Sequence, residues 1–329
     1  MPPPTTTARA RSTEADYREW GPPKLGMNPG DEDREPSTRI PVPQAGEGSI
    51  RGIHAHRSRA LRFYRDYVGL TPMPSPDSAI RLGAGARELV VLHPGAERPV
   101  VPRTSGLYHF AILVPDRREL ARVIARLGRL GWDQYPTDHV MTKANYLSDP
   151  DGNGIEIYTE SPEDGTMGFG NGTFVAYDKD GKPRSGRDPI DLEELYSHLR
   201  EDDRLDAPMP EATKMGHVHL HVADVDEALR FYHDLVGFDV MGHVPGVGFV
   251  SAGGYHHHLG LNTWAGRGAR PAPPGSAGLL RFTVELPARP DLEDVVGRLE
   301  HGDVSLTEEA GGFAVVDPSA NRVLFTTAA

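Results

Sequence analysis

The sequence contains no cysteine, and this absence removes several classes of site. Without thiols there are no disulfides, zinc–thiolate clusters or cysteine nucleophiles, which fits a protein of a reducing compartment. Long apolar runs are also missing, so no transmembrane helix is predicted. The first 30 residues have no apolar core of the kind that secretory signals carry. A cytoplasmic location is therefore expected.

Positive charge is scarce as well. The 35 Lys and Arg residues face 47 Asp and Glu residues, which gives a formal net charge of −12. Such a balance argues against nucleic acid and anionic membranes as partners. Histidine, by contrast, is plentiful at 15 residues. In a chain without cysteine, imidazole and carboxylate groups are the expected ligands of any metal.

Composition divides the chain into four parts. Residues 1–46 are rich in Pro, Gly and charged residues without an apolar period, which predicts a disordered or loosely draped tail. Two folded domains are expected, at residues 47–160 and 216–329. Residues 161–215 between them predict a connector with one helix, Asp191 to Leu199, and long loops. Loops of this length often cover functional sites.

An internal repeat runs through both predicted domains. Several short motifs recur 168 to 172 positions later in the chain. They are Arg62–Asp66 with Arg230–Asp234, Asp149–Asn153 with Asp317–Asn321, and Gly106–Leu107 with Gly278–Leu279. Together with the hydrophobic pattern they predict four related βαβββ modules, at about residues 47–98, 105–160, 216–265 and 277–329.

A carboxylate lies inside the last strand of the second module. The sequence Asp149–Asn153 predicts a tight turn, and the next residues alternate so that Glu156 faces away from Ile155 and Ile157. If both faces of the sheet are covered, Glu156 needs a cation, because a buried unpaired carboxylate is very costly. A sheet with one wet face and a solvated Glu156 is the alternative.

Histidines also lie within apolar strands. His109 belongs to the predicted strand from Leu107 to Val114, and His217, His219 and His221 alternate on one face of another. Each pattern has an ordinary explanation: a hydrogen-bonded core histidine in the first strand and a solvated stripe in the second. The residues alone leave both readings open.

These motifs together resemble the vicinal oxygen chelate superfamily. The resemblance rests on four modules, the sequence DPDGNGIE from Asp149, and GHVHL from Gly216, and it covers residues 47–329 apart from the connector. This superfamily includes glyoxalase I, fosfomycin-resistance enzymes and extradiol ring-cleaving dioxygenases. It implies an α+β fold in which the four modules form two open mixed-sheet barrels, with a divalent metal inside.

The resemblance also implies a ligand set. Family ligands fall early in the first strand of a module and in its last strand, which here gives His109 and Glu156 of module two and His217 of module three. The equivalent positions of the other modules carry Ser49, Arg281 and Leu324. The metal site is thus expected between modules two and three, while modules one and four form a second, metal-free barrel. Two His and one Glu favour iron(II), with manganese(II) as the second choice.

The extradiol branch adds three more residues. It implies a Tyr ten positions before the Glu ligand, here Tyr146, with His139 a few residues earlier. It also implies a His in a His-His-x-Leu-type sequence, here His257. By this resemblance His257 is the acid–base group, and His139 and Tyr146 orient the substrate. The neighbouring residues expected to bind substrate are His256, His258 and Asn262.

The expected activity is cleavage of a small aromatic diol by O₂, and the resemblance is strongest to bacterial four-module catechol-2,3-dioxygenases. The stretch from Gly253 to Trp264 contributes to that likeness. Larger extradiol enzymes take their ligands from modules three and four, so this chain departs from them. A glyoxalase-type isomerase or lyase with His258 as a fourth ligand is one alternative. A metal-free binding or resistance protein is another. The oligomeric state is open, and a homo-oligomer is among the states expected.

Overall fold

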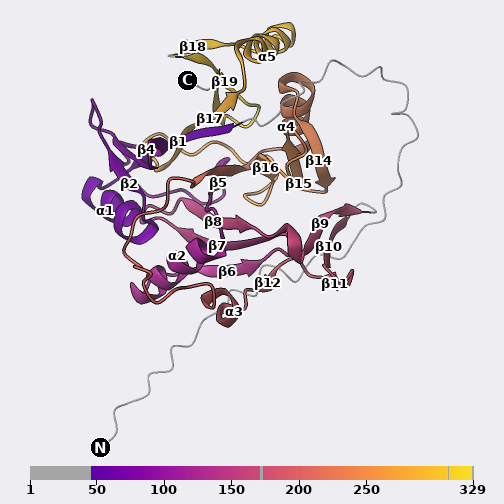
Figure 1. Cartoon of the computed structure of the whole chain (residues 1–329). Helices are drawn as coiled ribbons and strands as arrows, with labels where there is room; N and C mark the ends of the chain where they lie inside the picture. Colours follow the sequence, from indigo (N-terminus) through magenta and orange to yellow (C-terminus); the bar gives the residue numbers. More distant parts are fainter. Residues whose placement is uncertain (1–45, 171–172, 310, 328–329) are drawn as a thin grey trace, which may run out of the picture. The chain divides into compact units, whose positions relative to one another are not determined.

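The computed structural model describes residues 46–170, 173–309 and 311–327 (Figure 1). Of the predicted tail only Gly46 falls in this range, so that prediction lies outside the described residues. The described chain has two large mixed sheets and few helices, which confirms the expected α+β class. Neither sheet closes on itself, because the strand order of each has two ends. No helix in these ranges is long and apolar enough to cross a membrane.

Modules one and four share an eight-stranded sheet of order β18-β19-β20-β17-β1-β4-β3-β2. The two modules meet where β1 pairs antiparallel with β17. In Figure 1 the indigo strands of module one therefore lie beside the orange and yellow strands of module four. The strands are β1 Gly46–His54, β2 Thr71–Met73, β3 Ile80–Ala84, β4 Arg87–Pro94, β17 Gly278–Leu286, β18 Thr307–Glu309, β19 Gly312–Val316 and β20 Arg322–Thr327.

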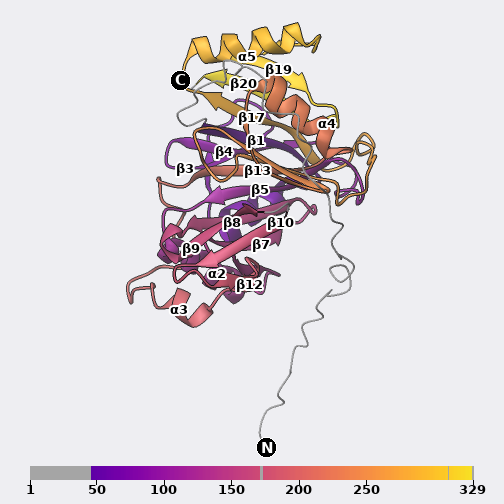
Figure 2. The same ribbon diagram turned by 90° about the vertical axis from the view of Figure 1, so that its right-hand side faces the viewer.

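Modules two and three share a nine-stranded sheet of order β12-β6-β7-β8-β5-β13-β16-β15-β14. Here the modules meet where β5 pairs antiparallel with β13 (Figure 2). The strands are β5 Gly106–Leu113, β6 Tyr135–Asp138, β7 Thr142–Ser148, β8 Gly154–Glu160, β12 Asp188–Pro189, β13 Lys214–His221, β14 Asp239–Val244, β15 Val247–Ser251 and β16 Leu259–Asn262.

The first strand of each module is followed by a helix that returns the chain for a parallel strand pairing. In module two, Asp116 caps this helix by accepting a hydrogen bond from the Glu119 amide at 2.8 Å. Its apolar stripe, which includes Leu120 and Leu127, is buried. The helical segments are α1 Arg57–Arg62, η2 Phe63–Val68, α2 Arg117–Arg129, η3 Pro162–Asp164, α3 Leu192–Tyr196, α4 Val225–Leu229, η4 Arg230–Val236 and α5 Arg289–His301.

The repeated motifs contact each other in the structure. Asp149 accepts hydrogen bonds from the amides of Asp151 and Asn153, which fixes the turn before β8. Its other oxygen accepts from the Tyr64 hydroxyl at 2.8 Å. In the second half of the chain the Tyr232 hydroxyl donates to Asp317 at 3.0 Å in the same way. Each pair is buried and joins two modules that belong to different sheets.

The connector differs from its prediction. The expected helix is present as the shorter α3, but the loops before it contain a three-stranded sheet, β9 Gly165–Gly170, β10 Thr173–Asp178 and β11 Pro183–Arg184. The Phe169 ring of this small sheet lies 5.6 Å from that of Phe249 on β15. A side chain at Gly242 would collide with Phe169, so glycine makes room for this contact.

The two buried Tyr–Asp pairs should contribute separately to stability. We expect Tyr64→Phe and Tyr232→Phe each to lower the free energy of unfolding by about 1.5–3 kcal/mol, the usual range for a hydrogen bond to a charged group. Urea denaturation followed by circular dichroism measures the change. The exposed Tyr177 on β10 provides the control, and Tyr177→Phe should stay within about 0.5 kcal/mol of the parent. Equal stability of all three variants would contradict the assignment.

Candidate metal centre

Three strands bring His109, Glu156 and His217 together. β5 lies between β8 and β13, and Ala111 on β5 is the direct cross-strand partner of both Glu156 and His217. His109 lies two residues before Ala111 and therefore on the same face. Because the alanine side chain is small, the three longer side chains can converge above it. The strand pairing thus positions all three residues.

The converging atoms are close to one another. The Nε2 atoms of His109 and His217 each lie 3.1 Å from the same Glu156 oxygen, Oε2. These two nitrogen atoms are 3.3 Å apart. All three side chains are buried, with exposed fractions of 6 % or less. One carboxylate oxygen and two imidazole nitrogens are a donor set suited to a divalent transition metal.

Electrostatics keeps the ligands in the forms that bind a metal. Burial opposes ionisation of Glu156, but the charge and hydrogen bonds of His217 and His109 outweigh it, so the pKa of Glu156 lies well below its usual value. Burial lowers the pKa of His109, which favours the neutral imidazole. The His217 Nδ1 atom has no hydrogen-bond partner among the described residues. An ionised Glu156 and a neutral His109 are the forms in which these two side chains bind a metal cation.

Tyr146 and His139 lie beside this centre. Tyr146 on β7 is the cross-strand partner of Glu156, and its ring centre is 5.6 Å from that of His109. Its hydroxyl is 2.9 Å from His139 Nε2, while His139 Nδ1 is 2.6 Å from the Gly186 carbonyl. A carbonyl only accepts, so Nδ1 carries the proton and Nε2 accepts from Tyr146. Burial and the Glu156 carboxylate raise the pKa of Tyr146 well above its usual value.

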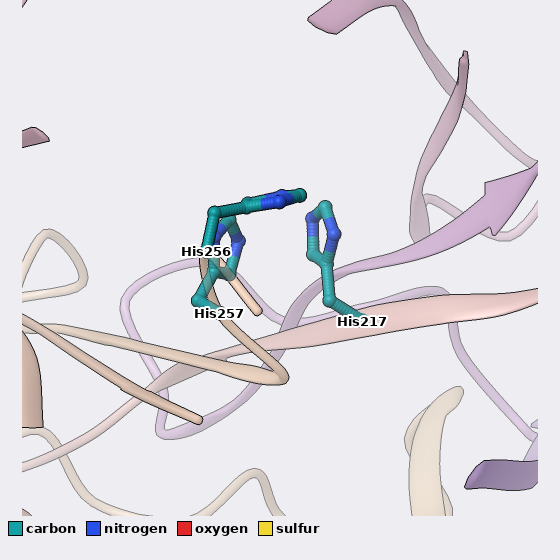
Figure 3. Close-up of side chains that lie close together, drawn as sticks. All are labelled: His217, His256 and His257. Carbon is teal, nitrogen blue, oxygen red and sulfur yellow. The ribbon is translucent and has the colours of Figure 1, made fainter. Parts of the chain in front are cut away.

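The histidine triplet approaches the centre from a loop. His256 and His257 lie in bent chain before β16, after Gly253 and Gly254, both of which have positive φ. The two side chains therefore do not follow the alternation of a strand. Figure 3 shows both side chains reaching toward His217, and nitrogen atoms of the three rings lie within 4.8 Å of one another. The ring centres of His257 and His217 are 4.3 Å apart.

His258 occupies a different environment. It is buried, and its Nδ1 atom accepts a hydrogen bond from the Ala252 amide at 3.2 Å and lies 2.8 Å from the Ser251 hydroxyl. It belongs to neither cluster of metal-compatible side chains among the described residues. The geometry therefore offers the place of a fourth nitrogen donor to His256 or His257, rather than to His258.

Burial keeps the triplet neutral. It lowers the pKa of His256 to about 3 and that of His258 to about 4, with the neighbouring His217 as the next cause. The pKa of His257 lies well below its usual value for the same two reasons. A neutral imidazole has one nitrogen that can accept a proton. In His258 the Ala252 amide already donates to that nitrogen, which leaves His256 and His257 as the candidates.

Asn262 lies at the far end of β16. Its Oδ1 atom is 2.8 Å from His221 Nδ1 and accepts from the Trp264 amide at 2.9 Å. The side chain is fully buried. The structure thus brings Asn262 to His221 instead of to the three converging ligands.

Two further groups near the centre were not expected from the sequence. His219 is the cross-strand partner of His109, is buried, and its Nε2 atom has no hydrogen-bond partner among the described residues. Its place in the alternating histidine stripe was the available signal. On the other side, the Tyr158 hydroxyl lies 2.5 Å from that of Tyr255. A side chain at Gly216 would collide with Tyr158, so glycine before His217 makes room for this pair.

A cavity of about 590 Å³ adjoins the centre. His109 and Tyr146 line it, together with Tyr108 and His221. Its other walls come from the segments that join modules one to two and three to four, residues 100–106 and 271–279. A volume of this size accommodates a small organic molecule beside His109, the member of the ligand set that lines it.

Known proteins share this sequence and architecture. The family model "Glyoxalase/Bleomycin resistance protein/Dioxygenase superfamily" matches residues 55–157 and 214–323. A catechol-2,3-dioxygenase of Bacillus subtilis (strain 168) is 41% identical over 265 residues, which are 79% of this chain and 89% of that protein.

Solved structures agree on the fold. Glyoxalase I from Zea mays superposes with a TM-score of 0.51 at 15% identity, covering 85% of this chain and 92% of the maize chain. A Bacillus subtilis protein with a provisional dioxygenase assignment gives a TM-score of 0.56 at 14% identity, covering 86% of this chain and 85% of the other. The chain therefore belongs to the glyoxalase/bleomycin resistance protein/dioxygenase superfamily.

Proposed function

We propose that the protein is an extradiol dioxygenase that opens a catechol-like ring with O₂ and a divalent metal, iron first and manganese second. The buried His109–Glu156–His217 cluster beside an open cavity is the observation that carries the proposal. Similarity to a Bacillus subtilis catechol-2,3-dioxygenase supports a dioxygenase-like role. A cytoplasmic location and a small aromatic diol as substrate remain part of the same proposal.

His109, Glu156 and His217 would hold the metal. A divalent metal bound there supplies a Lewis acid that polarises the substrate oxygens and keeps both reactants adjacent. One carboxylate and two neutral imidazoles leave a net positive charge on such a centre, which favours an anionic diol. The cavity beside His109 and Tyr146 gives the ring its place, and its partly apolar walls exclude water from the reacting oxygens.

His257 would move the proton. Its ring lies against that of His217 and against Phe249, with ring centres 4.3 and 4.7 Å apart. Because its pKa is held well below the usual value, it is neutral and can accept a proton from a substrate hydroxyl. The contact between Phe249 and Phe169 extends the connector over this side of the site and supports its shielding from solvent.

Tyr146 and His139 would position the substrate. The Gly186 carbonyl fixes the His139 ring, and His139 in turn fixes the Tyr146 hydroxyl. A hydroxyl that donates to His139 and is held in this way can accept a hydrogen bond from a substrate hydroxyl with little loss of entropy. His139 would then act through Tyr146 as a positioning residue.

A glyoxalase-type isomerase is the second candidate. The observation that favours it is the closeness of His256 and His257 nitrogen atoms to His217, which provides a fourth donor. Anaerobic reconstitution with iron(II) separates the candidates. O₂ uptake with catechol and a yellow product support the dioxygenase. Metal bound without O₂ uptake supports the isomerase, and absence of metal binding supports a metal-free binding protein.

The ligand set predicts metal content. We expect His109→Ala, Glu156→Ala and His217→Ala each to lose most of the bound iron, because a three-ligand site has no spare protein donor. Elemental analysis of the purified variants measures the loss. Ser49→Ala, at the module-one position equivalent to His217, is the matched control and should keep the full metal content. Loss of metal in Ser49→Ala, or retention of metal in His217→Ala, would refute the metal site between modules two and three.

The proton-transfer role predicts a rate effect without metal loss. We expect His257→Phe to keep its metal and to turn over catechol roughly 10²- to 10⁴-fold more slowly, the usual range for loss of a positioned acid–base group. Stopped-flow absorbance gives the rate, and elemental analysis gives the metal content. His256→Phe and His258→Phe complete the series. Metal loss in His256→Phe or His257→Phe would favour the isomerase. An unchanged rate in all three variants would leave the proposed dioxygenase mechanism without its acid–base residue.

The hydrogen bond between His139 and Tyr146 predicts that substitutions of these two residues have non-additive effects on kcat/KM. We expect Tyr146→Phe to lower kcat/KM about tenfold, which corresponds to the loss of one hydrogen bond. If His139 acts only by orienting that hydroxyl, the double variant with His139→Gln should be no slower than Tyr146→Phe alone. Steady-state kinetics on the three variants tests this. Multiplied effects in the double variant would assign His139 a separate role.

A further inference from the structure

The sheet of modules one and four carries arginines where the other sheet carries its histidines. In the nine-stranded sheet His109 and His219 are cross-strand partners on β5 and β13. In the eight-stranded sheet the repeat-equivalent partners on β17 and β1 are Arg281 and Arg51. The Glu156 position is taken by Leu324, so no carboxylate stands at the third place. A metal-binding face has thus become a cationic one.

Two more arginines complete this cationic row. Arg322 on β20 lies beside β17, and Arg81 on β3 is separated from Arg51 by Val91 of β4. His93, two residues after Val91, shares the face. We call Arg51, Arg81, Arg281 and Arg322 the arginine row.

The carboxylates nearby do not balance the row. Glu88 lies 3.8 Å from Arg51 and 2.8 Å from Arg81, and Glu309 pairs with both Arg281 and Arg322. Four guanidinium groups therefore share two carboxylates in ion pairs, and Asp77 is a third carboxylate whose charge acts on Arg81 and His93. Burial lowers the pKa of Arg281, and the neighbouring Arg51 and Arg322 lower it further. Like charges directly opposite on adjacent strands destabilise a sheet unless something neutralises them.

The row also has unused hydrogen-bond donors. The Nε atoms of Arg51, Arg81 and Arg281 are buried and have no hydrogen-bond partner among the described residues. A buried donor without a partner loses its hydrogen bonds to water and gains none in return. The side chains of the row are nevertheless 20–38% exposed, so a small solute can reach them. Planar guanidinium groups match the oxygens of phosphate and carboxylate groups.

We propose that the arginine row binds a small oxyanion with at least two negative charges, such as a phosphate or a dicarboxylate. The anion accepts hydrogen bonds from Arg51 and Arg281 and neutralises the positive charge that Glu88 and Glu309 leave over. This site lies on the other sheet from the metal ligands, and it does not depend on the activity proposed for them.

Isothermal titration calorimetry on the full chain tests the proposal. Inorganic phosphate and succinate are the two probes, each in buffer brought to constant ionic strength with chloride. We expect saturable binding of at least one probe, weakened tenfold or more in Arg51→Gln and in Arg281→Gln. Arg289→Gln is the matched control, because Arg289 is exposed on α5 and, among the residues that the structure describes, forms an ion pair only with Glu293. It should bind like the parent.

The other results overturn the proposal. Either of two results would refute it: neither probe gives saturable binding heat, or Arg51→Gln and Arg289→Gln bind the probe with equal affinity. Loss of binding in His217→Ala with full binding in Arg51→Gln would locate the anion at the metal centre instead. If Arg281→Gln does not fold, as judged by circular dichroism, the affinity of the Arg51→Lys variant for the probe decides between the outcomes. This variant keeps the charge but loses the planar fork, so weaker binding supports the proposal and unchanged binding refutes it.

Discussion

The antiparallel pairing of β5 with β13 is the constraint on which the candidate site depends. It joins two modules that are separated by the connector, and it places His217, Ala111 and Glu156 in one row across three strands. Desolvation of a carboxylate in that row is tolerated because two imidazoles share its oxygen. The pairing also sets the cavity wall, since β5 contributes both His109 and Tyr108 to it. The other strands of the site pair with β5 or β13, either directly or through a neighbouring strand.

Much of this arrangement follows from the sequence because its signals are local and repeated. The Asp149 turn fixes where β8 begins, and strand alternation then decides which way Glu156 points. Tyr146 was supplied by the family resemblance, and the register accounts for its place, because it pairs directly with Glu156 across β7 and β8. The pairing of module two with module three was harder to predict from the sequence. It was inferred only from which modules carry ligands, since no short-range pattern encodes contacts between distant strands.

The features of the structure that the sequence did not predict have identifiable physical causes. How the triplet at His257 is presented depends on Gly253 and Gly254, which adopt left-handed conformations and turn the chain, so that the adjacent side chains of His256 and His257 both reach His217. In the connector, the many Gly and Asp residues suggested loops. The stretch Thr173–Asp178 nevertheless alternates and is followed by a turn at Gly181, which together form a local hairpin. His219 was passed over because burial of a whole strand face cannot be read from alternation alone.

The order of modules in the chain differs from their order in the sheets, and this has an evolutionary consequence. Each sheet combines the first module of one half-chain with the second module of the other. This is the arrangement expected of an ancestral pair of identical two-module subunits that exchanged partners. Such a dimer would have had two identical sites by symmetry. A single polypeptide carries no such symmetry, so one sheet can hold His109 and His219 while the equivalent positions of the other hold Arg281 and Arg51.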